Sequence, residues 1–316
     1  MRIVFMGTPE FAVQPLERLI HNRHEVIAVY SQPDKLSGRG RALSSPPVKK
    51  AALGWKLHVI QPNHLKDADV IKHLASLNPD IIIVAAFGQL LPQAVLDIPR
   101  FGCINLHPSL LPKYRGSSPV AGSILAGDQF AGISIMLMDA GLDTGPVLAR
   151  AQVPVSIQDT TGSLTAKLSY IAAHLLLEVL IGWSRGEIKS QPQKDSEASY
   201  TGQITKQDGE IDWRNTAVDI WRQVRAFQPW PGCYTRFNGK QLKIIEALPL
   251  PESEDMKAGR VVALQTSGAH EPAFGINTAN GVLGVLKVQV EGKQVRSADE
   301  FLRGQRHLVG EILPSG

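Results

Sequence analysis

Cysteine is scarce in this chain of 316 residues, and its two occurrences, Cys103 and Cys233, lie far apart. A disulfide framework or a cysteine-based metal site needs more cysteines at closer spacing, so the sequence argues against both. Histidines such as His58, His64 and His73 form no metal-ligand pattern either. We therefore expect a protein of a reducing compartment that holds no metal.

Long apolar runs are also lacking. We recognise no stretch of about 18 apolar residues and no signal peptide or transit sequence, and residues 1–7 already predict a strand. With 43% hydrophobic and 20% charged residues, the composition is that of a soluble globular protein. We expect a cytoplasmic monomer without membrane association, and the chain length predicts two domains.

Neither sign of charge dominates the chain. The 33 basic and 29 acidic residues leave a formal net charge of +4, which is compatible with a polyanionic partner without demonstrating one. Residues 209–316 contain 13 basic and 12 acidic residues. Residues 35–50, in contrast, contain no acidic side chain and five basic ones: Lys35, Arg39, Arg41, Lys49 and Lys50. Any basic surface is therefore local.

Residues 31–47 predict a long loop in which glycines flank Arg39 and Arg41. A loop of this length in a compact domain is usually functional or disordered. Arginine side chains on a flexible arm can reach phosphate groups. The alternative is a solvated, mobile loop without a partner, and charge alone leaves both interpretations open.

The most distinctive stretch is FGCINLHPSLLPKYRGSSP at 101–119. Asn105 and His107 are two residues apart at the end of a predicted strand, 103–106, so their side chains project to the same face. Downstream, GLDTG at 141–145 places Asp143 on a glycine-flanked loop that can aim a side chain into a cleft. An amide, an imidazole and a carboxylate on neighbouring strand ends could stabilise an oxyanion and move a proton. We hypothesise that they form an active site.

Strands and helices alternate up to about residue 183, which predicts a doubly wound parallel α/β domain. The β-branched run at 81–84 is typical of a central parallel strand, and residues 87–91 leave its carboxyl end. Since open parallel sheets bind ligands beyond these ends, this loop and His107 should face one crevice. The predicted strands are 3–6, 26–30, 57–60, 80–86, 103–106 and 133–138, and the helices are 48–53, 67–77, 118–126 and 161–183.

The rest of the chain has a different pattern. Residues 184–208 are polar and predict a linker. A helix at 216–227 is followed by short β-rich segments at barrel-like spacing, which predicts a small β-barrel. These segments are 241–247, 259–264, 274–277 and 282–290. We thus expect one domain at 1–183, the linker, and a second domain at 209–316.

Two segments partly resemble known motifs, a dinucleotide fingerprint and the aspartic protease triplet, but neither matches in full. GTPEFA at 7–12 follows a predicted strand, and Thr8 suits a helix N-cap with Pro9 at the first helical position. The segment lacks the second and third glycines of a dinucleotide fingerprint, so we expect a plain strand–helix turn. The triplet that begins at Asp143 occurs once in an α/β pattern, whereas aspartic proteases need two such carboxylates. Both interpretations are rejected.

Taken in order along the chain, these segments resemble the methionyl-tRNA formyltransferase family of folate-dependent formyltransferases. The Asn–His–Ser-Leu-Leu-Pro motif and its aspartate are typical of the superfamily, and the basic loop and the C-terminal segments narrow the resemblance to the tRNA enzymes. The resemblance covers nearly the whole chain. The motifs are FMGTPEFA at 5–12, GRG at 38–40, NLHPSLLPKYRG at 105–116, GLDTG at 141–145, DGEIDW at 208–213 and RAFQPWPG at 225–232.

The resemblance implies a Rossmann-like domain that binds 10-formyltetrahydrofolate and a C-terminal oligonucleotide-binding-like β-barrel that helps to hold tRNA. It implies transfer of a formyl group to the α-amine of methionine on initiator tRNA, with Asn105, His107 and Asp143 as catalytic residues. The folate site would be lined by Phe87, Gly88, Leu90, Ser109, Leu110, Leu111, Pro112 and Asp139. The tRNA would be contacted by Lys35, Arg39, Arg41 and Lys206.

Two other classes of function remain open. A formyltransferase that acts on a UDP-linked amino sugar, or a formyltetrahydrofolate hydrolase, would keep Asn105, His107 and Asp143. Neither predicts the basic loop together with a second domain. A tRNA-binding protein without catalysis would keep the loop and the barrel, but it does not predict the three catalytic residue types.

Overall fold

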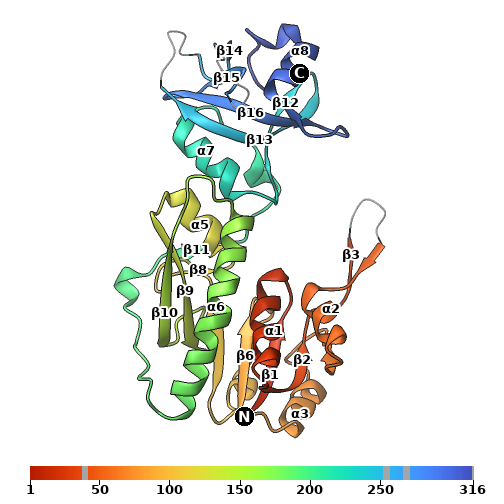
Figure 1. Ribbon diagram of the computed structural model, residues 1–316, viewed down its shortest axis with the longest axis vertical. Coiled ribbons are helices and arrows are strands. Elements are labelled where there is room, and N and C mark those ends of the chain that lie inside the picture. The colour runs from red at the N-terminus through yellow and green to blue at the C-terminus, as the bar shows by residue number, and fades with distance from the viewer. Residues whose placement is uncertain (38–41, 252–256, 266–270, 315–316) are drawn as a thin grey trace. The chain divides into compact units, whose positions relative to one another are not determined.

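The computed structural model describes residues 1–37, 42–251, 257–265 and 271–314, and it divides into two compact units (Figure 1). Arg39 and Arg41 lie outside the described residues. Unit 1 consists of Met1–Pro119, Phe130–Pro154 and Leu164–Gly202, and unit 2 consists of Val120–Gln129, Val155–Ser163 and Gln203–Gly316.

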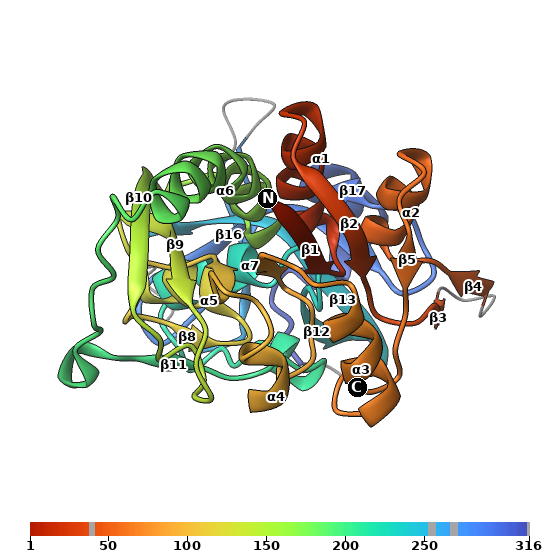
Figure 2. The ribbon, with the colours of Figure 1, turned by 90° about the horizontal axis from the view of Figure 1, so that it is seen from below.

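Unit 1 is built on a seven-stranded sheet in the order β10-β9-β7-β6-β1-β2-β5 (Figure 2). The strands from β7 to β5 are parallel, and β9 and β10 run antiparallel at one edge. The bounds are β1 Arg2–Gly7, β2 Glu25–Tyr30, β5 Val59–Ile60, β6 Ile81–Ala85, β7 Cys103–His107, β9 Phe130–Leu137 and β10 Val147–Pro154. The predicted Rossmann-like sheet is confirmed, and β10 is an additional strand that was not predicted.

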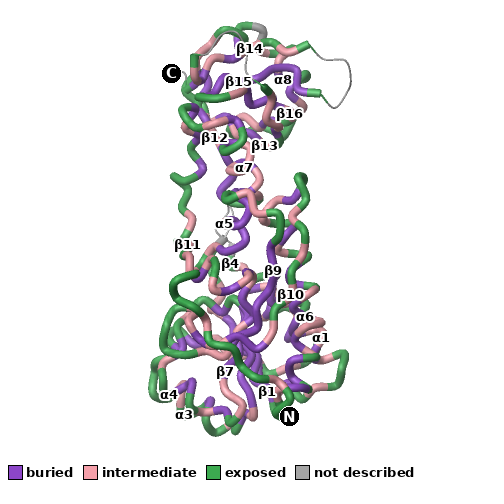
Figure 3. Tube along the Cα trace, turned by 90° about the vertical axis from the view of Figure 1, so that its left-hand side faces the viewer, coloured by how far each residue is buried: buried purple, intermediate pink, exposed green. Residues whose placement is uncertain are grey.

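Helices cover both faces of this sheet. Helices α1 (Val13–His21) and α6 (Thr161–Ser184) lie on one face, and α3 (Ala68–Ser76) and α4 (Gln93–Leu96) lie on the other (Figure 2). Buried residues follow the central strands (Figure 3). On the second face, the strand residues Val4, Met6, Ile82 and Val84 pack with Leu74 of α3 and Val95 of α4. Two further helices are α2 (Pro47–Gly54) and α5 (Pro119–Ala126).

The turn after β1 differs from its prediction. A 3₁₀ turn, η1 (Glu10–Ala12), follows Pro9 without a side-chain cap. The predicted role of Thr8 as N-cap is wrong, because its hydroxyl instead donates to the carbonyl oxygen of Phe87 at 2.9 Å. This bond ties the loop after β1 to the loop after β6, between two strands where the strand order reverses. Ligands of doubly wound sheets bind at this kind of position.

The expected loop at 31–47 contains a short hairpin. Strands β3 (Lys35–Ser37) and β4 (Ala42–Ser44) pair antiparallel, with Leu36 opposite Leu43. Both leucine side chains are exposed. The hairpin therefore presents apolar as well as basic side chains to its surroundings.

The polar segment expected as a linker belongs largely to unit 1. Gln191 forms a β-bridge with Val147 of β10, and β11 (Tyr200–Thr201) pairs in parallel with β8 (Arg115–Gly116). Between them lies the 3₁₀ turn η2 (Asp195–Glu197). The segment therefore packs on the 112–117 loop instead of running free, and only residues after Gly202 belong to unit 2.

Among the described residues, α6 is long and apolar enough to span a membrane by length and composition. It is not an uninterrupted apolar run, because it contains Lys167, His174 and Glu178. The helix packs within unit 1: Ser169 donates to the carbonyl oxygen of Phe11 at 2.7 Å, and Trp183 donates to that of Phe101 at 2.9 Å. Its residues Leu164, Leu168, Leu176 and Leu180 are buried, so they have a packing role in the core.

Unit 2 contains an antiparallel sheet in the order β12-β13-β16-β15-β14, with β17 paired to β16. Register shifts around Glu246 mark bulges in β13, which increase twist and curl the sheet into a half-barrel. Helix α7 packs against β13 and β16. The bounds are β12 Cys233–Phe237, β13 Lys240–Leu250, β14 Val261–Ala263, β15 Phe274–Asn277, β16 Val282–Val290, β17 Arg296–Ser297, α7 Ala217–Ala226 and α8 Ala298–Gly304, with 3₁₀ turns η3 Gln207–Gly209 and η4 Arg306–Leu308.

Candidate active site

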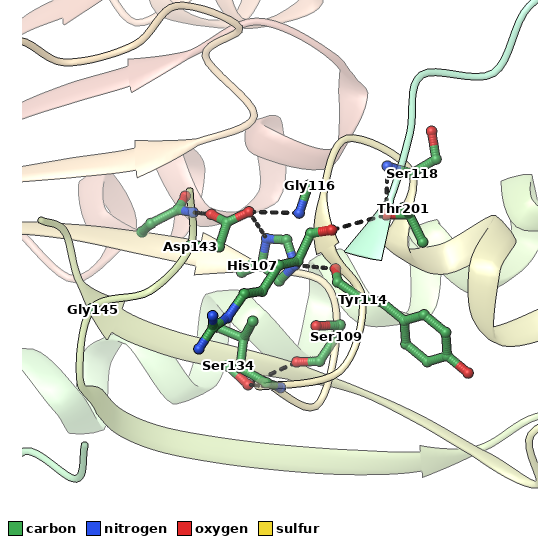
Figure 4. Close-up of polar contacts among 12 residues, drawn as sticks. His107, Ser109, Tyr114, Gly116, Ser118, Ser134, Asp143, Gly145 and Thr201 are labelled. Atoms are coloured by element: carbon green, nitrogen blue, oxygen red, sulfur yellow. Dashed lines mark hydrogen bonds and ion pairs between the residues drawn. The ribbon is translucent and has the colours of Figure 1, made fainter. Parts of the chain in front are cut away.

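Asn105 and His107 project from the carboxyl-terminal half of β7, as their spacing predicted. His107 is buried, and its imidazole lies between two acceptors (Figure 4). Nε2 lies 2.9 Å from the carbonyl oxygen of Tyr114, and Nδ1 lies 3.6 Å from Oδ2 of Asp143. Both ring nitrogens thus face oxygen atoms, so the orientation of the ring is held from two sides.

The Asp143 carboxylate is the centre of this group (Figure 4). Oδ1 accepts from the side-chain amide of Asn105 at 3.3 Å, and Oδ2 accepts from the backbone N–H of Gly116 at 2.9 Å. The backbone of Asp143 has a φ of 53°, in the left-handed region that few non-glycine residues adopt. Such a conformation persists only where the surroundings enforce it, which is frequent at functional sites. The structure therefore brings together the three predicted catalytic residues.

The loop at 139–145 is closed by specific contacts. Oδ1 of Asp139 accepts from the hydroxyl of Thr144 at 2.7 Å and from the backbone N–H of Gly141 at 3.0 Å. Gly145 packs so tightly that a Cβ there would lie 1.8 Å from the carbonyl oxygen of Leu137. Only glycine fits, so the glycine-flanked pattern has a steric origin.

A cavity of about 440 Å³ opens beside these residues. It is lined by Asn105, His107 and Asp143, and also by four of the residues predicted for the folate site: Phe87, Gly88, Leu90 and Asp139. A second cavity of about 610 Å³ shares Gly88, Leu90 and Asp139 with the first. The Leu90 side chain is 82% exposed at this shared wall, so it offers apolar surface to a ligand.

The other four residues predicted for the folate site lie in the loop after β7 and are absent from the lining of both cavities. Ser109 and Leu111 are buried, and the Ser109 hydroxyl donates to the carbonyl oxygen of Lys113 at 2.6 Å. The hydroxyl of Ser134 donates to the carbonyl oxygen of Ser109 and accepts from the backbone N–H of Leu111. Leu110 packs on Gly132, and Pro112 follows a cis peptide bond. These residues shape the loop that leads to Tyr114 and Gly116.

Cys103 lies two residues before Asn105 on β7 but is no candidate nucleophile. Burial, together with a smaller effect of the nearby Asp97 carboxylate, raises the pKa of its thiol to about 12. The reactive form of cysteine is the thiolate, so this side chain stays in the unreactive state near neutral pH. The chemistry of the cavity therefore rests on the amide, the imidazole and the carboxylate.

The predicted tRNA-contacting residues are dispersed. Lys35 is exposed at the start of β3, and Lys206 is exposed before η3 in unit 2. The base of the β3–β4 hairpin is held by Asp34, which accepts from Lys49, Ser45 and Gln61. The hydrogen bond from Lys49 is the largest of the effects that lower the pKa of the Asp34 carboxyl.

Several groups that contact the site were not predicted from the sequence. These are the carbonyl of Tyr114, the N–H of Gly116, the side chain of Arg115 and the side chain of Gln193. Backbone groups leave no mark in a sequence, and Gln193 belongs to a polar segment without periodicity. Of these groups, only Arg115 could have been found from the sequence, because it belongs to the NLHPSLLPKYRG motif. Its burial, with 1% of the residue exposed, was not predicted.

Comparison with known proteins agrees with this architecture. Residues 1–180 match the formyl transferase family, and residues 203–306 match the formyl transferase C-terminal domain. A parallel-dominated sheet, a curled C-terminal sheet and an Asn–His–Asp group at a cavity thus define a formyl transferase.

Full-length relatives identify the family more narrowly. The chain is 47% identical to the methionyl-tRNA formyltransferase of Dehalococcoides mccartyi (strain ATCC BAA-2266 / KCTC 15142 / 195), over 98% of this chain and 97% of that protein. It is 45% identical to the methionyl-tRNA formyltransferase of Roseiflexus sp. (strain RS-1), over 99% and 95% of the two chains. The chain belongs to the methionyl-tRNA formyltransferase family, which confirms the resemblance seen in its motifs.

Solved structures share the fold at lower identity. HypX from Aquifex aeolicus, in complex with tetrahydrofolic acid, superposes with a TM-score of 0.63 at 21% identity, over 96% of this chain and 47% of HypX. An N-formyltransferase from Helicobacter canadensis, in complex with folinic acid and dTDP-3-aminofucose, gives a TM-score of 0.63 at 18% identity, over 93% and 99% of the two chains.

Proposed function

We propose that this enzyme transfers the formyl group of 10-formyltetrahydrofolate to the α-amine of methionine esterified to initiator tRNA. The product is N-formylmethionyl-tRNA for translation initiation. The observation that carries the proposal is the convergence of Asn105, His107 and Asp143 on one cavity, in a chain of this family. The names of the relatives support methionyl-tRNA as a substrate, and the geometry supports these three residues as the catalytic ones.

The cavities suit a reduced folate. Their volumes fall within the roughly 300–1,000 Å³ of small-molecule sites. Phe87, Met136 and Met138 give the first cavity apolar walls, and Asp139 and Asp143 give it polar groups, a mixture that fits a pterin ring. The second cavity would take the rest of the molecule, and its residue Lys66 offers a cation for the glutamate carboxylates. We propose 10-formyltetrahydrofolate as the co-substrate on these grounds.

Each catalytic residue has a role that follows from its contacts. When the amine attacks the formyl carbon, the carbonyl oxygen gains negative charge and needs donors that are already in place. Asn105 uses one amide hydrogen on Asp143 and has a second for this oxygen. The bond between the formyl carbon and the folate nitrogen then breaks, and this nitrogen must gain the proton that the amine loses. Asp143 faces Nδ1 of His107, so we assign this proton transfer to the pair.

The tRNA would be bound by basic surfaces of both units. In unit 1 these are Lys35 and, by the sequence resemblance, Arg39 and Arg41. In unit 2 a cavity of about 340 Å³ is lined by Lys240, Lys293 and Arg296 and by no acidic residue among those described. A local concentration of cations attracts a polyanion even where the overall charge is near neutral. We include Lys206 on the resemblance alone.

The proposal is tested by measuring formyl transfer from 10-formyltetrahydrofolate to methionyl initiator tRNA, with a UDP-linked amino sugar in a parallel reaction. We expect N-formylmethionyl-tRNA as the product and no formylated sugar. Formylation of the sugar, or release of formate alone, would overturn the tRNA assignment and leave the N-terminal site intact. Binding of the tRNA without turnover would overturn the assignment of an enzyme.

We further propose that the protein acts as a cytoplasmic monomer, since its proposed tRNA substrate takes part in translation there. Light scattering after size-exclusion chromatography should give a mass near 34.4 kDa. A mass of twice that value would contradict the monomer.

A further inference from the structure

Gln193 lies 50 residues beyond Asp143 in the sequence, yet its side chain binds the loop that carries this carboxylate. Its amide nitrogen donates to the carbonyl oxygen of Asp143 at 2.8 Å and to that of Gly145 at 2.7 Å. Both hydrogens of the amide are thereby used. The two bonds bracket Thr144 and hold the backbone where Asp143 has its unusual φ of 53°.

A buried arginine fixes the orientation of this amide. The side-chain oxygen of Gln193 accepts from Nε of Arg115 at 3.1 Å and from Nη2 at 3.0 Å. A guanidinium can only donate and a carbonyl can only accept, so the oxygen of Gln193 must face Arg115 and its nitrogen must face the loop. Arg115 also donates to the Asp195 carboxylate at 2.8 Å and to the Tyr200 hydroxyl at 3.2 Å.

The same arginine is adjacent in the chain to a residue that holds the carboxylate itself. The backbone N–H of Gly116 donates to Oδ2 of Asp143. Arg115 and Gly116 form strand β8, and both residues pair with β11. Asp143 is therefore held twice from this strand: at its carboxylate by Gly116, and at its backbone through Gln193 and Arg115.

We propose that Gln193 is a positioning residue for the formyl-transfer reaction, which acts by holding Asp143 opposite His107. The inference rests on the proposed function. Gln193 is not among the residues that line either cavity beside the catalytic group, so its effect must pass through the loop. Displacement of a catalytic group by about an ångström can cost 10²-fold in rate.

The first variant is Gln193→Glu. It keeps the size of the side chain and its pairing with Arg115, but sets a carboxylate oxygen against the carbonyl oxygens of Asp143 and Gly145. We expect kcat to fall by roughly 10- to 100-fold, with unchanged KM values for 10-formyltetrahydrofolate and methionyl-tRNA. Gln191→Glu is the matched control, because Gln191 is an exposed glutamine in the same segment. We expect its kcat to equal that of the wild type.

A double-mutant cycle separates positioning from general damage. If Gln193 acts only through Asp143, then Gln193→Glu added to Asp143→Asn causes no further loss of the single-turnover rate. Losses that multiply would overturn the inference. So would a wild-type rate for Gln193→Glu alongside a strongly impaired Asp143→Asn enzyme. A wild-type rate for Asp143→Asn would remove Asp143 from the mechanism and overturn the inference with it, whereas absence of formyl transfer by the wild-type enzyme would overturn the proposed function.

Thermal unfolding is measured for every variant. If Gln193→Glu does not fold, Gln193→Met carries the same cycle, because it keeps the length of the side chain without donors or acceptor. For Gln193→Met we expect the same rates as for Gln193→Glu, and the same results would overturn the inference. A rise in KM with unchanged kcat for either variant would indicate a structural or binding role and would also overturn the inference.

Discussion

A Cβ atom on Gly145 would lie 1.8 Å from the carbonyl oxygen of Leu137, far inside contact distance. Leu137 is the last residue of β9, and its backbone N–H donates to the carbonyl oxygen of Pro146 at 2.9 Å. The two ends of the catalytic loop are thus in direct backbone contact. The position of Asp143 between them depends on this closure.

Gly145→Ala should therefore displace the catalytic loop. We expect kcat to fall by about 10²-fold, because the added methyl group has no room and the Asp143 carboxylate moves away from His107. The measurement is formyl transfer at saturating substrates, together with thermal unfolding. Gly54→Ala in α2 is the control, since nothing lies within 4 Å of its Cβ position and alanine is favourable in a helix. Full activity in Gly145→Ala would show that closure of the loop is not needed.

Asn105→Ala should lower the rate of formyl transfer by about 10²–10³-fold, which is typical for loss of one oxyanion donor. His107→Ala should lower it by about 10²–10⁴-fold, which is typical for loss of a group that transfers a proton. The reason is that both side chains project into the cavity from a fixed strand. Rates are compared at equal folded fraction, checked by circular dichroism. His58→Ala removes an exposed imidazole outside either cavity and should leave the rate unchanged. Wild-type turnover in Asn105→Ala or His107→Ala would remove that residue from the mechanism.

Much of unit 1 could be predicted because its strands carry strong local signals. The run at 81–84 is β-branched and apolar, and it forms the central strand β6. Strand β10 was not predicted, although the alternation of its inward and outward residues is a typical strand signal. Asn105 and His107 could be paired from their spacing alone, and their meeting with Asp143 followed from the two loop motifs.

The contacts of the polar segment could not be predicted. Gln193 reaches Asp143 by a tertiary contact across 50 residues, and no local pattern encodes such a bond. Likewise, Ser109 and Leu111 fit an apolar ligand slot by composition, but their burial depends on Ser134 of a neighbouring strand. Side chains whose partners are distant in sequence remain ambiguous until the fold is known.

Arg39→Ala should weaken the use of methionyl-tRNA and leave folate binding unchanged. The prediction rests on the glycine-flanked basic sequence and the family resemblance, because a guanidinium is suited to phosphate contacts. The measurements are KM for the tRNA over a range of salt concentrations and the dissociation constant for the folate. Loss of one phosphate contact should also reduce the salt dependence of tRNA binding. Lys72→Ala, on the exposed side of α3, is the control. A parallel loss of folate affinity would contradict a role in tRNA binding.

Asp34→Asn should loosen the base of the β3–β4 hairpin and lower the thermal midpoint in a pH-dependent manner. The carboxylate accepts from Lys49 and Gln61, and the hydrogen bond from Lys49 leads the effects that hold its pKa below the ordinary value of 3.8. A group whose pKa is depressed by folding stabilises the folded state above its unfolded pKa, and this stabilisation is lost as the pH falls through the folded value. The difference in thermal midpoint between wild type and variant should therefore be constant above about pH 5 and shrink below about pH 4. Asp69→Asn, on the first turn of α3, serves as the control. A difference that stays constant down to pH 3 would show that the ionised carboxylate of Asp34 does not anchor the hairpin.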